Sequence, residues 1–262
     1  PLNATCILEN KKEYFTGLQF FDYNRNERFG NLLNELSGPI TWADFLRIKY
    51  DKAYDPAGSY VRNFKTMYEL DASKYPKLAD VINRLKAWDK TGDKEDTLAA
   101  MAMLTNKFLA KGSKFPYAFL MIKEEPLSET EVVTALTEAR HYLLRHFGKL
   151  NVPLGDVQRL SRGDLSFPVG GLSEVPRACD VKYDKKKKYY RMTAGDGYYQ
   201  LVKFSPSGVE IESISPFGAS MHPDSPHYSD QMGLFVNEQT KTMTLEKETV
   251  FRNAKRVYHP GE

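Results

Sequence analysis

The sequence predicts an α+β fold, with a mainly helical part over residues 1–150 and a mainly β part over residues 151–262. Apolar residues recur every three or four positions in several segments of the first part, which is typical of amphipathic helices. After Val152, Pro, Gly and Ser become frequent, and short β-type segments alternate with turn sequences. The two parts together are long enough for one large domain or two small ones.

The first part is predicted to contain a succession of amphipathic helices after an extended lead-in and a loop over residues 1–23. The expected ranges are 24–36, a segment that begins after Thr41, 78–88, 98–109, and a segment that begins after Ser128 and ends at Gly148. Thr41 is followed three residues later by Asp44, and Ser128 is followed three residues later by Glu131. This spacing is typical of a capping box, in which a hydroxyl and an acid accept hydrogen bonds from free amide groups at the start of a helix.

The second part is predicted to form an antiparallel meander that ends in a helix. The expected strands are 188–192, 198–205, 209–215 and a short one at 242–245, and the final helix covers 247–254. The turn sequences at 193–197 and 205–208, which contain Gly, separate the first three strands and indicate hairpins.

Composition limits the classes of partner. The net charge is +3, from 37 basic and 34 acidic residues, which is too small to indicate a nucleic-acid partner by itself. The one basic run, residues 185–188, is interpreted as a solvated hairpin tip or loop. No apolar run is long enough to span a membrane, and the first residues do not have the pattern of a signal peptide. We therefore expect no nucleic-acid partner and no membrane span.

Aromatic and sulfur-containing residues give two further expectations. Aromatic residues make up 13% of the chain, so aromatic packing is expected to dominate the core. The two cysteines, Cys6 and Cys179, can form one disulfide at most and do not decide the cellular compartment.

Residues 214–231 form a polar segment, rich in Pro, Gly, Ser and His, that follows a β-type segment and precedes an apolar run. Ser225, His227 and Asp230 are the residue types of a nucleophilic triad, and His222 could join the last two as a metal ligand. Triad residues normally converge from distant parts of a chain, no strand–turn–helix elbow surrounds Ser225, and the histidine spacing is not a zinc spacing. We therefore expect His227 and Asp230 to brace the loop and to pin the strands on either side of it.

The same segment carries a resemblance to a known family. FGASMHPDSPHYSDQ, which ends at Gln231, resembles the pattern G-Q-S-G-H-x-x-S-P-H-Y-x-D-Q near the C-terminus of penicillin-acylase-type amidases, and departs from it at Ala219 and Met221. Other segments resemble the family in the same order: YNRNERFGNLLNEL, LKAWDKTGDKEDTLAAM, SRGDLSFPVGGLSEVPRA, GDGYYQLVKFSPSGVEIESISPFG and VYHPGE. The resemblance thus covers the whole chain and follows the C-terminal half of the family.

The resemblance implies an N-terminal nucleophile hydrolase, of which this chain would form part of an αββα sandwich. Enzymes of this family cleave the amide bond of N-acylated small molecules with an N-terminal Ser, Cys or Thr, whose own α-amine acts as the base. The acylated amide would be a β-lactam derivative, an acyl-homoserine lactone or another small molecule. The resemblance implies no cofactor for catalysis and a periplasmic or secreted location.

The nucleophile is expected upstream of this chain, because Pro1 has no hydroxyl or thiol. The resemblance also places the oxyanion-hole Asn three residues before Pro1. We therefore expect this chain to be the C-terminal segment of the nucleophile-bearing chain, without amidase activity by itself. Its partners would be the upstream part of the same precursor, including a smaller chain, and a small-molecule amide substrate. The alternative is a non-catalytic binding or assembly module that keeps the same architecture.

Two residues are expected to have roles by the same resemblance. Arg25 occupies the position of the family's active-site Arg, where a cation would orient the site and lower the pKa of the α-amine. The alternative is a helix-surface Arg paired with Glu27 or Asp22. Glu13 occupies the position of a carboxylate that binds a structural calcium in some family members, and hard oxygen ligands suit calcium. The alternative for Glu13 is a solvated acid.

Overall fold

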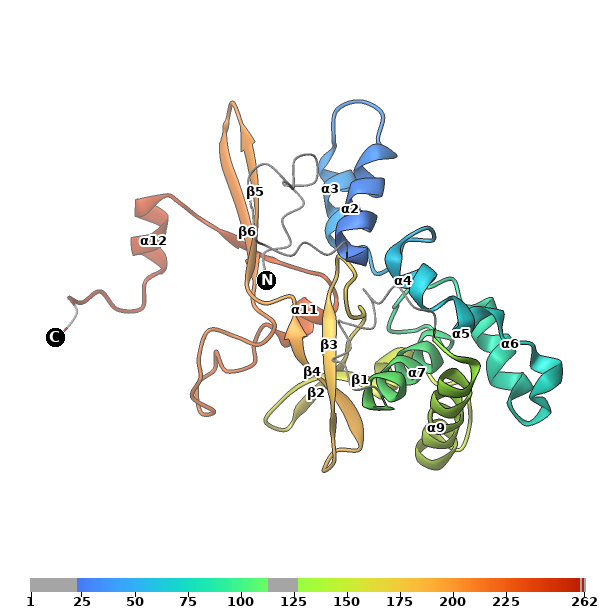
Figure 1. Cartoon of the computed structure of the whole chain (residues 1–262). Helices are drawn as coiled ribbons and strands as arrows, with labels where there is room; N and C mark the ends of the chain where they lie inside the picture. The colour runs from blue at the N-terminus through green and yellow to red at the C-terminus, as the bar shows by residue number, and fades with distance from the viewer. Residues whose placement is uncertain (1–22, 113–126, 260, 262) are drawn as a thin grey trace, which may run out of the picture. The chain divides into compact units, whose positions relative to one another are not determined.

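The computed structural model describes residues 23–112, 127–259 and 261 (Figure 1). The chain divides into two compact units: unit 1 comprises residues 1–161 and 166–195, and unit 2 comprises residues 162–165 and 196–262. Unit 1 contains most of the helices and a mixed sheet, whereas unit 2 contains an antiparallel sheet and two short helices. The α+β class that the sequence predicts is therefore confirmed.

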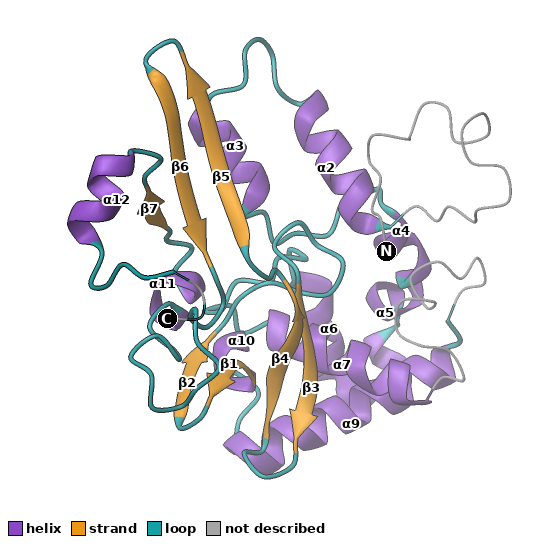
Figure 2. Ribbon diagram, turned by 90° about the vertical axis from the view of Figure 1, so that its left-hand side faces the viewer, coloured by secondary structure: helices purple, strands orange, loops and turns teal. Residues whose placement is uncertain are grey.

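The helical part of unit 1 follows the apolar periodicity of the sequence. In chain order its α-helices are α2 (Asn24–Asn34), α3 (Trp42–Lys49), α4 (Ser59–Asn63), α5 (Lys65–Glu69), α6 (Ala79–Ala87), α7 (Ala99–Gly112), α9 (Glu129–Phe147) and α10 (Leu154–Val157). Two short 3₁₀ turns, η2 (Ala72–Lys74) and η3 (Pro76–Leu78), lead into α6. The longest helices, α7 and α9, pack against each other (Figure 2). Each helix that the sequence predicts over residues 24–148 is present.

Both predicted capping boxes are formed. The Thr41 hydroxyl accepts a hydrogen bond from the Asp44 amide at the start of α3, and the Asp44 carboxylate accepts one from the Thr41 amide. Ser128 and Glu131 make the same exchange at the start of α9. At the other end of α9, Gly148 has a φ of 68°, which is the left-handed conformation that ends helices and that glycine adopts without a steric penalty.

Aromatic packing fills the core of the helical part, as the composition predicts. The rings of Tyr54 and Tyr60 are stacked with 3.4 Å between their centroids, and Phe64 stacks on Tyr60 at 4.6 Å. Trp88 meets the Tyr54 ring edge-on at 6.2 Å. The Tyr60 hydroxyl accepts a hydrogen bond from the side-chain amide of Asn106, so this buried polar atom has a partner.

The sheet of unit 1 has the order β2-β1-β4-β3. Its strands are β1 (Gln158–Arg162), β2 (Leu165–Pro168), β3 (Cys179–Asp184) and β4 (Tyr189–Gly195). β4 pairs in parallel with β1 on one side and antiparallel with β3 on the other. The basic run, residues 185–188, forms the turn of the β3–β4 hairpin, so the interpretation of this run as a hairpin tip is confirmed.

One part of the predicted meander is wrong. The turn sequence at 193–197 does not join two paired strands, because β4 and the next strand, β5 (Tyr199–Ser205), belong to different sheets. Both edges of β4 are already paired, with β1 and β3, so no edge is left for β5. No strand was predicted over the residues of β1, β2 or β3, and without them β4 had no visible partner other than β5.

Unit 2 contains the rest of the predicted meander. β5, β6 (Gly208–Ile214) and β7 (Lys241–Met243) form a three-stranded antiparallel sheet with the order β5-β6-β7. The predicted turn at 205–208 joins β5 to β6, with Ser205 opposite Gly208. A strand was expected after residue 231. The apolar run there is instead a helix, α11 (Met232–Val236). The predicted C-terminal helix is present as α12 (Lys247–Asn253).

None of the helices in the described parts of the chain combines the length and the apolar character that a membrane span needs. Cys179 is buried and is not in a disulfide. Cys6 lies outside the described residues.

Candidate functional site

The N-terminal turn of α2 is fixed by Asn24, whose side chain is fully buried. Its side-chain oxygen accepts a hydrogen bond from the Asp55 amide at 2.7 Å, and its side-chain amide donates to the Glu174 carbonyl at 2.9 Å. Asn24 therefore ties three segments together: the start of α2, the loop before α4, and the loop before β3. Arg25, the predicted site residue, follows directly and takes its position from this anchor.

One side of α2 is held by charged hydrogen bonds to the loop before α4. Arg28 donates two hydrogen bonds to the Asp51 carboxylate, at 3.1 and 2.8 Å, and Asn31 donates one to Asp55 at 2.9 Å. The hydrogen bond to Asp51 raises the pKa of Arg28 above its ordinary value. Paired donors from one guanidinium fix geometry as well as adding energy, so this side of α2 is a structural attachment.

Glu27 belongs to the same attachment. Its carboxylate accepts hydrogen bonds from the Ser59 amide at 2.6 Å and the Ser59 hydroxyl at 2.7 Å, which lie at the start of α4. It also pairs with Arg62 at 3.0 Å. Glu27 is therefore not the partner of Arg25 that one sequence-based alternative considered, and the other candidate, Asp22, lies outside the described residues.

Arg25 lies one turn before Arg28 on α2 and faces Glu174 in place of Asp51. The terminal nitrogen Nη2 of Arg25 is 3.6 Å from Oε2 of Glu174, and the two side chains are 32% and 18% exposed. Burial raises the pKa of Glu174, the Asp180 charge raises it further, and the Arg25 charge opposes both. The pair is thus a loose contact between a half-buried cation and an acid whose ionised form is disfavoured.

A glycine-rich loop carries Glu174 to this position. Gly171 has a φ of +93°, and a Cβ there would lie 2.3 Å from the Arg177 carbonyl, so only glycine fits. The Tyr54 hydroxyl donates to the Ser173 carbonyl at 2.9 Å, and the Ser173 hydroxyl hydrogen-bonds Asp180. Glu174 itself has a φ of 60°, a left-handed conformation that costs a residue with a side chain about 1–3 kcal/mol. The fold keeps this acid in place despite that cost.

A pocket of ≈ 500 Å³ opens beside Arg25, between α2, α3 and the loop of Glu174. Its walls are mostly apolar, with the polar ends of a few side chains at the margin; the lining residues are Arg25, Asn26, Phe29, Leu33, Ile40, Phe45, Ile48, Lys49 and Pro176. Such a mixture of apolar walls and a few convergent polar groups is typical of a small-molecule site.

Polar atoms without hydrogen bonds gather at the same place. Among the described residues, Nε of Arg25, Oδ1 of Asn26 and Oε2 of Glu174 are buried and have no hydrogen-bond partner. Buried polar atoms are normally satisfied, and exceptions call for an explanation such as a ligand group. The arrangement can therefore receive a polar or anionic group at Arg25 and an apolar group in the pocket.

The segment of residues 214–231 is held by internal hydrogen bonds in unit 2. Its base is closed by Gln231, whose amide donates to the Phe217 carbonyl at 2.9 Å and whose side-chain oxygen accepts from the Ser215 amide at 3.0 Å. The His227 carbonyl accepts from the Ser220 amide at 3.0 Å, and a Cβ at Gly218 would lie 2.2 Å from the same carbonyl. The loop is therefore a closely packed connection.

His227 and Asp230 brace this loop, with a ring nitrogen of His227 2.8 Å from Oδ2 of Asp230. The Ser225 hydroxyl accepts from the backbone amide of His227 at 3.2 Å and so serves to shape the turn. A triad would instead need a hydrogen bond between that hydroxyl and the imidazole. The loop connects β6 to α11, so the expectation that it pins two strands is correct for one side only.

Metal binding by the predicted residues finds no support in the described ranges. Glu13 lies outside them. No group of three or more His, Cys, Asp or Glu side chains close enough to hold a metal occurs among residues 23–112 and 127–259. His222, His227 and Asp230 therefore do not form the metal site that was considered for this loop.

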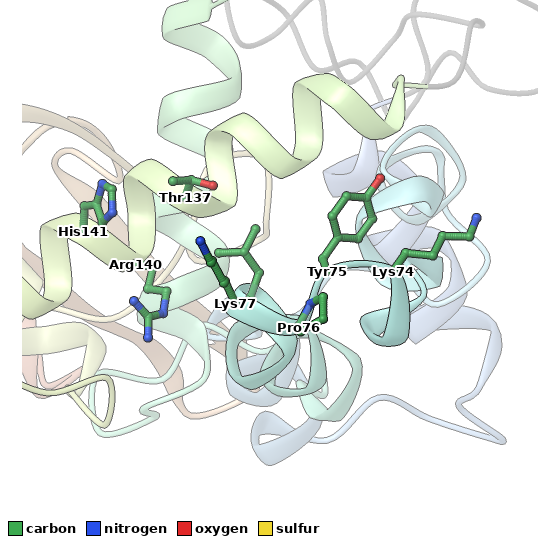
Figure 3. Close-up of a pocket in the computed structure, with 8 residues that line it drawn as sticks. Lys74, Tyr75, Pro76, Lys77, Thr137, Arg140 and His141 are labelled. Carbon is green, nitrogen blue, oxygen red and sulfur yellow. The ribbon is translucent and has the colours of Figure 1, made fainter.

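Two further pockets lie along α9, in the same unit. One of them, of ≈ 550 Å³, lies between α9 and the 3₁₀ turns before α6 (Figure 3). In Figure 3 the Lys77 amine and the Arg140 guanidinium come from opposite walls. Arg140 is 3.3 Å from Asp80, so part of this charge is compensated. The other pocket, which His141 also lines, lies between α9, the end of α7 and the β3–β4 hairpin.

The sequence pointed to Arg25 as a site residue and gave no indication of Glu174, which lies beside it. The resemblance covered the segment SRGDLSFPVGGLSEVPRA, in which Glu174 occupies a variable position, so no motif marked it. The available signal was the pair Gly170-Gly171, since adjacent glycines indicate a close approach of backbone. The glycine pair indicates where the loop lies, but it does not indicate which side chain of the loop faces Arg25.

Comparison with known proteins identifies the family to which the chain belongs. The model of the penicillin amidase family matches residues 3–252. The solved structure of a thermostable penicillin G acylase from Alcaligenes faecalis is 16% identical, with a TM-score of 0.45. The match covers 92% of this chain and 52% of that one, so the chain spans about half the length of the acylase it matches. From the family match over nearly its whole length, the chain belongs to the penicillin amidase family.

Proposed function

We propose that the chain is the C-terminal part of an amidohydrolase of the penicillin acylase type, which cleaves the amide bond of N-acylated small molecules. Family membership supports the class of reaction. The observation in the structure that carries the proposal is Arg25: a half-buried cation beside a mostly apolar pocket, with unsatisfied polar atoms around it. Charged groups that are fixed in advance at partly dry sites are the usual source of electrostatic stabilisation in enzymes.

In this proposal the nucleophile is an N-terminal Ser, Thr or Cys that lies upstream in the same protein. Its free α-amine must be neutral to act as the base. A cation nearby disfavours a second positive charge and so lowers the pKa of that amine. Arg25 is held in place for this role, because Asn24 and Arg28 fix its helix to two other segments.

Glu174 has a complementary role in the same proposal. Because its ionised form is disfavoured and it lies 3.6 Å from Arg25, it compensates the cation incompletely. Arg25 therefore keeps a positive electrostatic potential toward the pocket, while the contact with Glu174 still restricts the position of its side chain. A fully ionised, closely paired acid would cancel much of that field.

The remaining part of the protein is proposed to cover the apolar face of the β5–β6 hairpin. Phe204 is 78% exposed, Tyr198 60% and Val209 42%, which leaves large apolar side chains uncovered on one hairpin. Groups of exposed apolar residues usually mark an interface. The proposed partner is the upstream part of the same precursor.

N-terminal sequencing and the intact mass of the native polypeptide that contains this chain test the proposal. We expect that polypeptide to begin upstream of Pro1 with a free Ser, Thr or Cys, produced by a processing cut. A native polypeptide without such a terminus, and without a partner chain that supplies one, would contradict the enzyme proposal and favour a non-catalytic binding or assembly module.

A further inference from the structure

A second site is indicated by the pocket between α9, the end of α7 and the β3–β4 hairpin. Its volume is ≈ 460 Å³, and it shares no lining residue with the pocket at Arg25. In Figure 2 the turn of the β3–β4 hairpin lies beside α9. The pocket is thus built from three elements that are distant in sequence, and it includes Lys185 of the basic run, for which the proposed acylase reaction has no use.

One wall of this pocket is aromatic. The rings of Tyr142, Tyr183 and Tyr190 form a cluster, with centroid distances of 5.7 Å for Tyr142–Tyr190, 5.3 Å for Tyr183–Tyr190 and 6.0 Å for Tyr142–Tyr183. His146 adds a fourth ring, 4.5 Å from Tyr142. Tyr142 and Tyr190 are buried, whereas Tyr183 is 40% exposed and leaves ring surface open to the pocket. A flat ring can stack or pack edge-on at such a wall.

The rim of the pocket is cationic. Lys111, Arg145 and Lys185 line it, and Glu138 is the carboxylate that lines it with them. Among the described residues, no carboxylate lies within ion-pair distance of these three cations. The pKa of His146 is lowered by burial and, in second place, by the positive charges of Lys188 and Arg145.

The hairpin turn that carries Lys185 is held in a fixed shape. The Asp184 carboxylate accepts hydrogen bonds from the amides of Lys186 and Lys187 at 2.9 and 3.1 Å. The Tyr142 hydroxyl donates to the Lys188 carbonyl at 3.0 Å, which fastens the turn to α9. The backbone of the turn is therefore held at a fixed spacing from the aromatic wall, so a ligand has to order only the exposed cationic side chains of the rim.

We propose that this pocket binds a small anion that carries an aromatic ring, such as an aryl carboxylate or an aryl phosphate. The ring lies against Tyr183 and its neighbours, and the anionic group lies between Arg145 and Lys185. Guanidinium and ammonium groups bind carboxylate and phosphate by charge-assisted hydrogen bonds, and tyrosine rings favour aromatic over aliphatic contacts. The proposal is independent of the proposed acylase function.

Calorimetric titration of the intact protein that carries this chain tests the proposal. The probes are phenyl phosphate and benzoate, compared with cyclohexyl phosphate, inorganic phosphate and benzyl alcohol. We expect phenyl phosphate or benzoate to bind saturably, and at least about tenfold more tightly than the probes that lack either the ring or the charge. The stronger of these two ligands identifies the anionic group that the rim prefers.

Variants locate the binding site. We expect Arg145→Gln and Lys185→Gln each to weaken binding of the preferred aryl anion about fivefold to tenfold, in line with the loss of one charge-assisted contact. Tyr183→Leu removes the preference for phenyl over cyclohexyl, and Tyr183→Phe keeps it. The matched control is Lys77→Gln, which removes the same charge from the neighbouring pocket of Figure 3 and leaves binding unchanged.

Two outcomes would overturn the proposal. One is the absence of saturable binding for both phenyl phosphate and benzoate. The other is binding that Arg145→Gln and Lys185→Gln leave intact, or that Lys77→Gln weakens as much as they do. Thermal unfolding of each variant, within a few degrees of the parent protein, confirms that a loss of binding is not a loss of folding.

Discussion

The guanidinium of Arg25 lies 3.6 Å from the carboxylate of Glu174, at the point where α2 meets the loop before β3. The contact is too long for a hydrogen bond, and both partners keep a buried polar atom without one. Arg28, one turn further along α2, makes the opposite kind of contact, two short hydrogen bonds to Asp51. One helix therefore carries one Arg that is fully used in holding the fold and one that is left available beside a pocket.

Replacing Arg25 should reduce activity and leave the fold intact. We expect Arg25→Gln to lower kcat/KM for amide hydrolysis by the intact protein about 100-fold, the usual scale for removing a fixed electrostatic group. The free energy of unfolding should change by less than about 1 kcal/mol, because the pair with Glu174 is long and partly exposed. The acidic limb of the pH profile should move to higher pH, since the α-amine loses the cation that lowers its pKa.

Arg28→Gln is the matched control, with the same charge change on the same helix. It leaves the Asp51 carboxylate, whose side chain is 13% exposed, without its paired donors. We expect a loss of about 2–3 kcal/mol in the free energy of unfolding, measured by urea titration, and no shift in the pH profile. Equal effects of the two variants on the pH profile would contradict the distinction between these residues.

Glu174→Gln should stabilise the protein at neutral pH. Because burial raises the folded-state pKa of Glu174 above its unfolded value, the folded state binds the proton more tightly. The native protein therefore loses stability as pH rises from the unfolded pKa through the folded one, and a neutral Gln does not. We expect the variant to unfold at higher urea concentration than the parent at pH 7, and at about the same concentration below pH 4. A less stable variant at pH 7 would mean that the pair with Arg25 outweighs burial.

Gly218→Ala should destabilise the loop of residues 214–231. The added Cβ would lie 2.2 Å from the His227 carbonyl and 2.6 Å from a carboxylate oxygen of Asp230. We expect a loss of about 2–4 kcal/mol, typical of overpacking against backbone. Gly233→Ala in α11 is the control, because nothing lies within 4 Å of its added Cβ and Ala favours a helix. Thermal unfolding and amide exchange at residues 215–231 measure the difference, and equal stability of the two variants would show that the loop is not closely packed.

Ser128→Ala should weaken the start of α9. The variant loses the hydroxyl that accepts from the Glu131 amide, which typically costs about 1 kcal/mol. Ser128→Asp keeps an acceptor and a negative charge at the helix start and should restore most of the loss. Urea unfolding measures both, and a neutral Ser128→Ala would show that the capping box adds no stability.

The helices were predictable because their signals are local. Capping boxes at Thr41 and Ser128, the glycine after α9 and the apolar periodicity all act within a few residues, and the structure confirms each of them. The sheet of unit 1 was not predictable in the same way. Its parallel pairing of β1 with β4 joins strands that are far apart in the chain, so no local pattern distinguishes this partner from β5.

The candidate site was predictable only in part, for the same physical reason. The resemblance placed Arg25 on a helix, and the structure shows which residues hold that helix and which side chain faces it. Glu174 meets Arg25 through a loop whose shape depends on Gly171, Tyr54 and Asn24. Such tertiary contacts determine the electrostatic field at a site and how deeply its side chains are buried. They produce no periodic pattern in the sequence.

Trapping of the acyl group tests the central claim most directly. The intact protein is incubated with a panel of N-acylated small amides, quenched with acid and digested, and the peptides are examined by mass spectrometry. The account predicts an acyl adduct on an N-terminal Ser, Thr or Cys upstream of Pro1, and a much smaller yield of that adduct in Arg25→Gln than in Arg28→Gln. An adduct on Ser225, or amide turnover with no adduct on such a terminus, would contradict it.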